Sequence, residues 1–377
     1  MKREKLSRRQ FVKLTGSLGL TTFGLPPLLT MLEGCSADGT KTPTNTREGS
    51  TVLNIPDPTP PFWGLWSVRR EDLADVYCAG FDGVRPAYGT DDNYATTHEY
   101  AQAAETIGFK KLIFDAGLRW NWGIYGGNVS AITSAITTHF QQIKNNVQTI
   151  ACYPYFDEID LFGRRYEPDI GIQGCHDDTY NPSTGRYDFD REYNPDFGNI
   201  LTECSDVQSA NAIVSHAAAE ASRILGTSLI MATVPLDIIY ACDVTSFPCT
   251  NIPVSQRDNW PAYHYNQHAP ILMSSAYDTP TTMSNLLNAM GYNYAGKQIS
   301  QIINFFDSEH GCRNGCSVND IKNQINVNAN FTSEHWFYEG RWVNTSLTVN
   351  GVNSLTQWQN LLQAIQFFGV PSRGPCI

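Results

Sequence analysis

Short apolar runs and amphipathic segments alternate along most of the chain. The apolar runs are nearly continuous and do not alternate with polar residues, which is typical of strands buried on both faces of a parallel sheet. The pattern predicts eight such strands, which lie within residues 62–68, 79–89, 109–115, 147–156, 228–237, 269–278, 298–310 and 333–342.

Segments with apolar residues at helical spacing separate these runs. The clearest, residues 129–145, predicts a helix with one apolar face, which is formed by Val129, Ile132, Ile136, Phe140 and Ile143. Further helices are predicted over residues 97–108, 205–226, 282–292, 317–328 and 354–369.

Strands and helices that alternate in this way predict an α/β fold. About 320 residues hold the eight strands, which matches the size and alternation of a (β/α)8 TIM barrel. A doubly wound open sheet is the alternative, but no G-x-G-x-x-G or G-x-x-x-x-G-K loop follows a predicted strand, which favours the barrel. Residues 157–203, rich in Asp, Tyr, Gly and Asn, predict a long irregular insertion after strand 4, of a length typical of functional loops.

The N-terminal residues predict export. "SRRQFVK" at 7–13 resembles the twin-arginine signal and precedes an interrupted apolar run, so residues 1–34 are interpreted as a signal peptide. "LEGC" resembles the lipoprotein box, which implies lipidation of Cys35 and a membrane tether; the alternative is cleavage nearby and a soluble secreted protein. Residues 35–60 predict a disordered tether, and 61–377 a catalytic barrel in the periplasm or at the cell surface.

Charge and cysteine content narrow the classes of partner. Without residues 1–34 the chain carries 20 basic against 35 acidic residues, a poor match for nucleic acid. We expect a monomer with a carbohydrate partner. Export predicts that some of the nine cysteines other than Cys35 are paired, with one left over, and spacing favours Cys242–Cys249 and Cys312–Cys316. A metal site at "HGCRNGC", residues 310–316, is the alternative for the second pair.

Acidic residues gather where the predicted strands end. In such barrels the working side chains project from the carboxyl ends of the strands, so these residues predict a carboxylate-lined bowl. They are Asp82, Asp115, Asp157, Glu158, Asp160, Asp237, Asp278, Asp307, Glu309, Glu334 and Glu339, with Arg85, His310 and His335 beside them.

Carboxylates in this number suit either glycoside hydrolysis or binding of a divalent metal. Aromatic residues near the same strand ends favour sugar, because flat rings bind the apolar faces of pyranoses. Trp120 and Trp122 follow Asp115, while Tyr155 and Trp336 lie on the fourth and eighth predicted strands. Packing of these rings into the barrel core is the alternative.

The positions of two glutamates resemble retaining glycosidase barrels. There the fourth strand supplies the acid/base and the seventh the nucleophile, which implies these roles for Glu158 and Glu309, with Asp115, Asp157 and Asp307 in support. The segment "AAETIGFKKLIFDAG", with "AGFDGV" before it, also looks like the early strands of α-1,3-glucanase-type barrels. That resemblance implies that Asp115 acts with Asp157 or Glu158 in an inverting reaction.

The sequence therefore predicts a glycoside hydrolase that needs neither cofactor nor metal. The residues expected to position the sugar are Trp120, Trp122, Tyr155, Asp237, His310, Glu334 and Trp336. A metal-dependent, phosphodiesterase-like barrel hydrolase and a non-catalytic sugar-binding lipoprotein remain as alternatives. No G-x-S-x-G motif is present, which counts against the common kind of serine hydrolase.

Overall fold

The computed structural model describes a barrel of strands and helices around it. The described residues are 61–87, 94–157, 180–181, 186–187, 205–233, 265–275, 279–305, 315–340, 343, 347–349, 351–370 and 373. The predicted signal peptide, the tether and Cys35 lie outside these residues. The barrel belongs to one unit that runs from Pro60 to Ile377.

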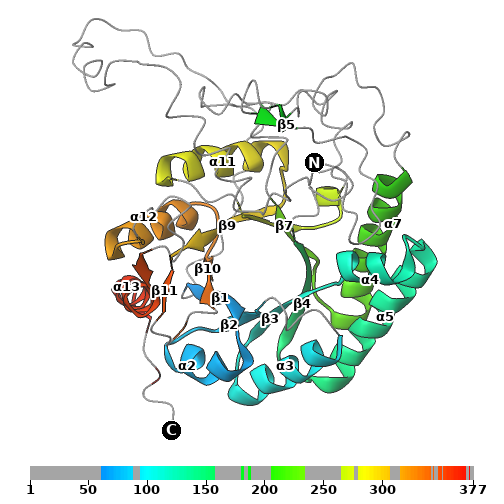
Figure 1. The fold of residues 1–377 in the computed structure, drawn as a ribbon, viewed down its shortest axis with the longest axis horizontal. Coiled ribbons are helices and arrows are strands. Elements are labelled where there is room, and N and C mark those ends of the chain that lie inside the picture. The colour runs from blue at the N-terminus through cyan, green and yellow to red at the C-terminus, as the bar shows by residue number, and fades with distance from the viewer. Residues whose placement is uncertain are drawn as a thin grey trace, which may run out of the picture. The chain divides into compact units, whose positions relative to one another are not determined.

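Eight parallel strands close into a barrel in the order β1-β10-β9-β8-β7-β4-β3-β2, which Figure 1 shows as a ring. The strands are β1 (Phe62–Val68), β2 (Gly83–Pro86), β3 (Lys111–Asp115), β4 (Ala151–Asp157), β7 (Ile230–Thr233), β8 (Ile271–Ser274), β9 (Gln298–Asn304) and β10 (Glu334–Tyr338). Each lies in a predicted apolar run, except that β4 extends one residue beyond its run to Asp157, and the prediction of a (β/α)8 barrel is confirmed.

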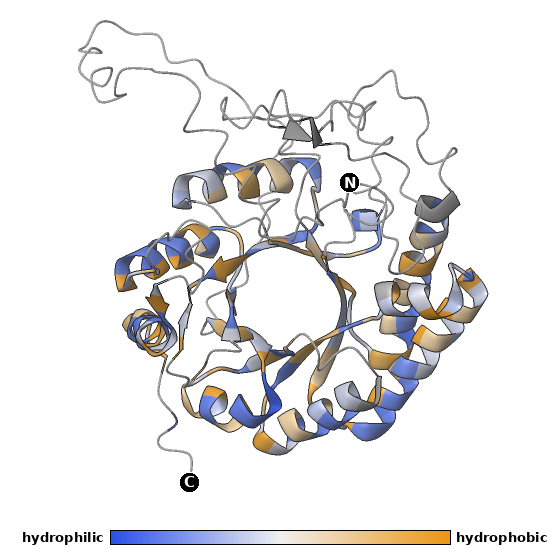
Figure 2. Ribbon diagram, in the orientation of Figure 1, coloured by the Kyte–Doolittle hydropathy of each residue, from blue (hydrophilic) through white to orange (hydrophobic). Residues whose placement is uncertain are grey.

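Helices lie outside the ring and carry both polar and apolar stretches, as elements with one buried face should (Figure 2). They are α2 (Leu73–Cys78), α3 (Tyr94–Ile107), α4 (Leu118–Tyr125), α5 (Val129–Asn146), α7 (Ser205–Glu220), α11 (Pro280–Asn293), α12 (Val318–Ala329) and α13 (Ser354–Phe367). Short helical turns, η2 (Arg70–Asp72) and η5 (Ala221–Leu225), precede α2 and extend α7. Two antiparallel pairs, β5 (Tyr180–Asn181) with β6 (Arg186–Tyr187) and β11 (Thr348–Val349) with β12 (Val352–Asn353), complete the described elements.

Local side chains determine where several helices begin. Asn128 accepts a hydrogen bond from the Ala131 amide at the start of α5. Before α12, Ser317 and Asp320 exchange side-chain-to-backbone hydrogen bonds in a capping box. These caps satisfy amides that the first helical turn leaves without partners.

Two apolar clusters form the core. The larger lies between strands and helices, and the smaller fills the barrel, because successive residues of a strand face opposite sides. The interior cluster consists of Trp66, Ile113, Tyr155, Ile230, Ala232, Ile271, Met273, Ile302 and Trp336. The Trp336 ring needs the glycine on β1 beside it, since a Cβ at Gly64 would lie 2.3 Å from its Cε3 atom.

Cysteine states differ among the described residues. Cys78 and Cys316 are disulfide-bonded, while Cys152 is a free, buried thiol. Cys312, Cys242 and Cys249 lie outside the described residues, so both pairings stay predictions. Within the described part of the chain, no helix is both long and apolar enough to cross a bilayer.

Candidate active site

Two acids end neighbouring strands of the barrel. Asp115 is the last residue of β3 and Asp157 the last of β4. The register places Asp115 opposite Tyr155, so Asp157 lies two residues further along. Strands lie about 4.8 Å apart and rise about 3.3 Å per residue, which puts these two Cα atoms about 8 Å apart. Both side chains share the inner side with Tyr155 and Ile113, because residues two apart on a strand face the same way.

The Asp115 carboxylate also fastens the start of the next helix. Its Oδ1 atom accepts a hydrogen bond from the Gly117 amide at 2.6 Å. Gly117 has a φ of +81° and directly precedes α4, a left-handed conformation that favours glycine. The chain therefore turns sharply after the acid, and α4 begins three residues beyond Asp115.

A buried cation lies one layer deeper. Arg85 on β2 is fully buried, and by the register it is level with Ile113, two residues before Asp115. Its Nη2 donates to the Tyr155 hydroxyl and its Nη1 to the Pro86 carbonyl. The guanidinium carbon lies 4.9 Å from the centroid of the Tyr155 ring and 5.6 Å from that of Trp66. Arg85 thus gives this part of the barrel a fixed positive charge, held in place by rings.

Glu339 adds a further carboxyl at this end. It directly follows β10 and is only 3% exposed. Neither Arg85 nor Glu339 was among the residues predicted to act on a substrate. The sequence signal that could have identified them is their position at strand ends. Arg85 is one residue before the end of β2, and Glu339 directly follows β10.

The predicted placement of Glu334 and Asp82 at the carboxyl end is wrong. Glu334 is the first residue of β10, and Asp82 comes just before β2. Asp82 instead pairs with Lys110 and Arg373, each with a nitrogen 2.8 Å from its Oδ1. The run "SEHWFYEGRW" has an acid before and after its apolar centre, so the pattern alone did not reveal which one begins the strand.

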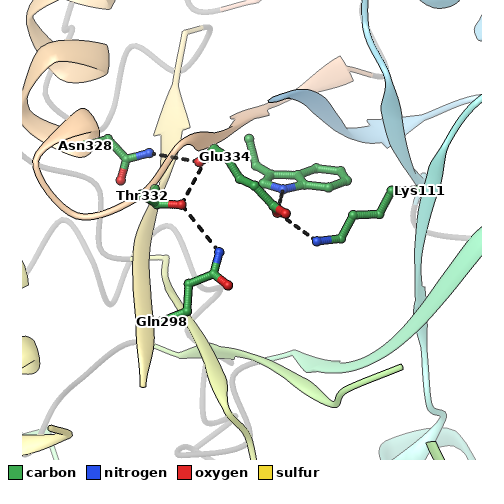
Figure 3. A network of polar contacts seen from close by, with 6 residues as sticks. Lys111, Gln298, Asn328, Thr332 and Glu334 are labelled. Carbon is green, nitrogen blue, oxygen red and sulfur yellow. Dashed lines mark hydrogen bonds and ion pairs between the residues drawn. The ribbon is translucent and has the colours of Figure 1, made fainter. Parts of the chain in front are cut away.

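Glu334 belongs to a polar network at the amino end of the barrel (Figure 3). Its Oε2 atom lies 2.7 Å from Nζ of Lys111, the first residue of β3. The same atom accepts a hydrogen bond from Trp336 Nε1 at 3.3 Å. The Lys111 ammonium also lies 4.2 Å from the centroid of the Tyr153 ring.

Neighbouring side chains complete this network. The Glu334 amide donates to Thr332 Oγ1 at 3.0 Å, and Gln298 Nε2 donates to the same hydroxyl at 3.4 Å. Asn328 Nδ2 donates to the Glu334 carbonyl at 3.5 Å. Among the described residues, the charges of Lys111 and Glu334 at the amino end of the barrel therefore pair with each other, which suits a structural role.

Burial separates the predicted sugar-binding rings. Trp120 on α4 is 36% exposed, whereas Trp122, on the same helix, packs into the core. Tyr155 and Trp336 are fully buried inside the barrel. For these three buried rings, the structure favours packing, the alternative that the sequence left open.

Several predicted site residues lie outside the described part of the chain. They are Glu158, Asp237, Asp307, Glu309 and His310. Within the described residues, no group of three or more His, Cys, Asp and Glu side chains could hold a metal ion.

Comparison with known proteins gives structural similarity alone. No family model and no curated protein matches the chain. Among solved structures, a β-mannanase from the blue mussel Mytilus edulis is similar with a TM-score of 0.42 and 13% identity, covering 81% of this chain and 90% of that chain. An oxaloacetate acetylhydrolase is similar with a TM-score of 0.41 and 9% identity, covering 82% and 93%. The fold assignment rests on the strand order, and the functional argument on this chain's own residues.

Proposed function

We propose that the chain is a glycoside hydrolase that cleaves a polysaccharide or oligosaccharide at the carboxyl end of its barrel. One observation carries the proposal. Asp115 and Asp157 end neighbouring strands on the inner side of the barrel, with Cα atoms about 8 Å apart by strand geometry.

A Cα separation of about 8 Å leaves space for two carboxyl groups at the distance that an inverting mechanism needs. An inverting glycosidase uses two carboxyl groups about 6.5–9.5 Å apart, which leaves room for a water molecule between one of them and the sugar. One carboxyl donates a proton to the leaving oxygen, and the other, ionised, takes a proton from the attacking water. In the inverting form of the proposal these roles fall to Asp115 and Asp157, and Glu158 is the next residue along the chain.

A retaining mechanism with Glu158 as acid/base and Glu309 as nucleophile is the other form of the proposal. It requires the two carboxyl groups to lie about 5–5.5 Å apart. The two forms predict different essential residues, so substitution distinguishes them.

The position of Trp120 supports a sugar substrate. The ring lies on α4, whose first residue is three positions after Asp115, and it reaches the surface. An accessible indole can stack on the apolar face of a pyranose beside the reacting bond.

The test is a set of four single substitutions assayed against a panel of polysaccharides: Asp115→Asn, Asp157→Asn, Glu158→Gln and Glu309→Gln. For the inverting form, Asp115→Asn and Asp157→Asn each lower kcat by at least about 10³-fold, and Glu309→Gln leaves it unchanged. NMR of the first-formed anomer gives an independent reading of stereochemistry.

The exposed carboxylate of Glu99 supplies the matched control, because Glu99→Gln removes a charge that pairs with Arg70 at the surface of α3. Loss of activity only in Glu158→Gln and Glu309→Gln supports the retaining form. Hydrolysis that survives all four substitutions contradicts this site. A protein that binds glycans and hydrolyses none of them is a sugar-binding protein and not an enzyme.

A further inference from the structure

Arg373, near the end of the chain, is fastened to the segment between β1 and β2. Its amide donates to the Cys78 carbonyl at 3.0 Å. Its Nη1 atom donates to the carbonyl oxygens of Tyr77 at 2.9 Å and Phe81 at 2.8 Å, and its Nη2 atom lies 2.8 Å from Asp82 Oδ1. The guanidinium carbon also lies 4.1 Å from the centroid of the Tyr77 ring. These contacts hold Arg373 against the end of α2.

Ring contacts join the same two parts of the chain. The Trp358 ring of α13 stacks on that of Phe81 with centroids 5.9 Å apart. The ring of Phe368, just beyond α13, lies 6.2 Å from that of Trp63 on β1. Since α13 follows β10, and β10 pairs with β1 to close the ring of strands, the last helix lies beside the first strand. Arg373 therefore lies at the seam where the barrel closes.

Cys78, the last residue of α2, is disulfide-bonded. Of the other described cysteines, Cys152 is a free thiol and Cys316 lies at the opposite end of the barrel. The Cys316 Sγ atom is 3.3 Å from the carbonyl oxygen of Asn304, the last residue of β9, whereas α2 ends just before the amino end of β2. Disulfide-bonded residues have Cα atoms at most about 7 Å apart, much less than the roughly 20 Å that a strand as long as β9 spans. The partner of Cys78 therefore lies outside the described residues.

The connections between strands select among the remaining cysteines. Those in the segments that leave the carboxyl ends of β4, β7 and β9 are Cys175, Cys204, Cys242, Cys249 and Cys312. Cys35 is separated from β1 by 26 residues. Cys376 comes only three residues after Arg373, whose amide bonds to Cys78 itself. Three residues reach at most about 11 Å, and a short connection gives a higher effective concentration than a long one, so Cys376 is the favoured partner.

We propose that Cys78 and Cys376 form a disulfide that closes the barrel seam covalently. Its formation takes two protons and two electrons from the two thiols, and a protein disulfide of an oxidising compartment receives them and becomes a dithiol. The bond closes a loop that contains every strand of the described barrel except β1. Arg373 acts before the bond forms, because it holds the chain within reach of Cys78. No substrate takes part, so the proposal is independent of glycoside hydrolysis.

Peptide mapping of the full chain identifies the partner of Cys78. Protein purified from an oxidising compartment is alkylated without reductant and digested with trypsin. Residues 71–110 form one tryptic peptide, since Pro86 protects the bond after Arg85. We expect this peptide to be linked to residues 374–377, and reduction to release both and add one hydrogen to each. A link to any other peptide, the one with Cys35 included, or alkylation of Cys78, overturns the proposal.

Thermal unfolding tests whether the bond stabilises the barrel. Cys78→Ser and Cys376→Ser should each lower Tm by about 5 °C. The double variant should lose no more than either single variant, because all three lack the same bond. Losses that add in the double variant contradict a shared bond. If Cys78→Ser does not fold, Cys376→Ser still decides, since a Tm within about 1 °C of wild type overturns the stabilising role.

Arg373→Ala tests whether the contacts of Arg373 guide the pairing. After reduction and removal of the reductant, we expect the bond to re-form about 10-fold more slowly in Arg373→Ala than in wild type, as mapping of quenched samples measures. Arg223→Ala is the matched control, because Arg223 in η5 also pairs with a carboxylate, its Nη2 atom 2.6 Å from Glu220 Oε2. We expect it to re-form the bond at the wild-type rate. Equal rates in wild type and Arg373→Ala, or equal slowing in both variants, overturn the role of Arg373.

Discussion

The two ends of the barrel differ in how their charged side chains are arranged. At the amino end, Glu334 of β10 meets Lys111 of β3, so an acid and a base from separate strands pair inside the barrel. At the carboxyl end, Asp115 and Asp157 end neighbouring strands, so like charges share one wall. Opposite charges stabilise each other when partly buried, whereas like charges repel.

The difference shows how one fold separates stability from chemistry. The Lys111 side chain is 7% exposed and that of Glu334 is 24% exposed, so the pair gains from mutual attraction but would be costly to break. Acids placed together at the other end cost stability because like charges repel. Such arrangements are typical of active sites, where function outweighs this cost. Substitutions at the amino end should therefore lower stability more than activity, and substitutions at the carboxyl end should lower activity more than stability.

The largest expected effect is on activity at the carboxyl end. Asp157→Asn should lower glycoside hydrolysis by at least about 10³-fold and leave the free energy of unfolding within about 1 kcal/mol of wild type, because it removes one of two like charges. Urea unfolding and kinetic assays of the same sample measure both quantities. Loss of more than about 2 kcal/mol with retained activity would make this end structural as well.

The next largest expected effect is a pH dependence of stability that arises at the amino end of the barrel. Burial lowers the pKa of His335, beside Glu334, to about 4, and the Glu334 carboxylate partly opposes this shift. The unfolded chain, with an ordinary histidine pKa near 6.5, binds a proton in the window between these values that the folded protein does not. Stability should therefore fall as pH drops from about 6.5 to about 4, by up to about 3 kcal/mol.

His335→Gln removes the titrating group and should flatten this part of the pH dependence. Its ring bonds to Asn328, whose Nδ2 lies 3.2 Å from Nδ1, and an amide can still accept that hydrogen bond. Denaturant unfolding at several pH values measures the slope for both proteins. Identical slopes would show that His335 does not contribute to the acid sensitivity.

Breaking the ion pair should have a smaller effect. Lys111→Met leaves the partly buried Glu334 carboxylate without its cation and should lower the free energy of unfolding by about 2 kcal/mol, less than for a fully buried pair. The neighbouring lysine is the matched control, since Lys110 is 71% exposed and pairs with Asp82 at the surface. Lys110→Met should cost at most about 1 kcal/mol. Similar losses in both variants would contradict the structural role assigned to the amino-end pair.

The smallest effect is one of reactivity. Burial raises the pKa of the Cys152 thiol to about 12, so almost no thiolate forms at neutral pH. Iodoacetamide should therefore label Cys152 only after denaturation, as peptide mass mapping would show. Rapid labelling of the folded protein would mean that β4 opens toward solvent.

The sequence predicted the strands better than the site. Runs such as residues 62–68 and 109–115 gave strand positions within two residues, because burial on both faces leaves a local and continuous apolar signal. Asp115 and Asp157 were likewise found as strand ends, since each stands where its apolar run stops.

Arg85, Glu334 and the aromatic residues were harder to interpret. An apolar run does not show which of its flanking residues are paired in the sheet. An acid beside the run can therefore lie at the amino end or at the carboxyl end of the strand. The inner or outer direction of a ring also depends on the register of the whole sheet, as Trp336 shows by filling the space that Gly64 leaves.

By itself the sequence determined the eight-strand alternation, the helices between the strands and the acidic character of the strand ends, because these depend on spacing within a few residues. Tertiary structure alone decided that Lys111 meets Glu334, that the His139 ring packs against Phe114, and which rings are buried. Those contacts join residues far apart in the chain, and only closure of the barrel brings them together.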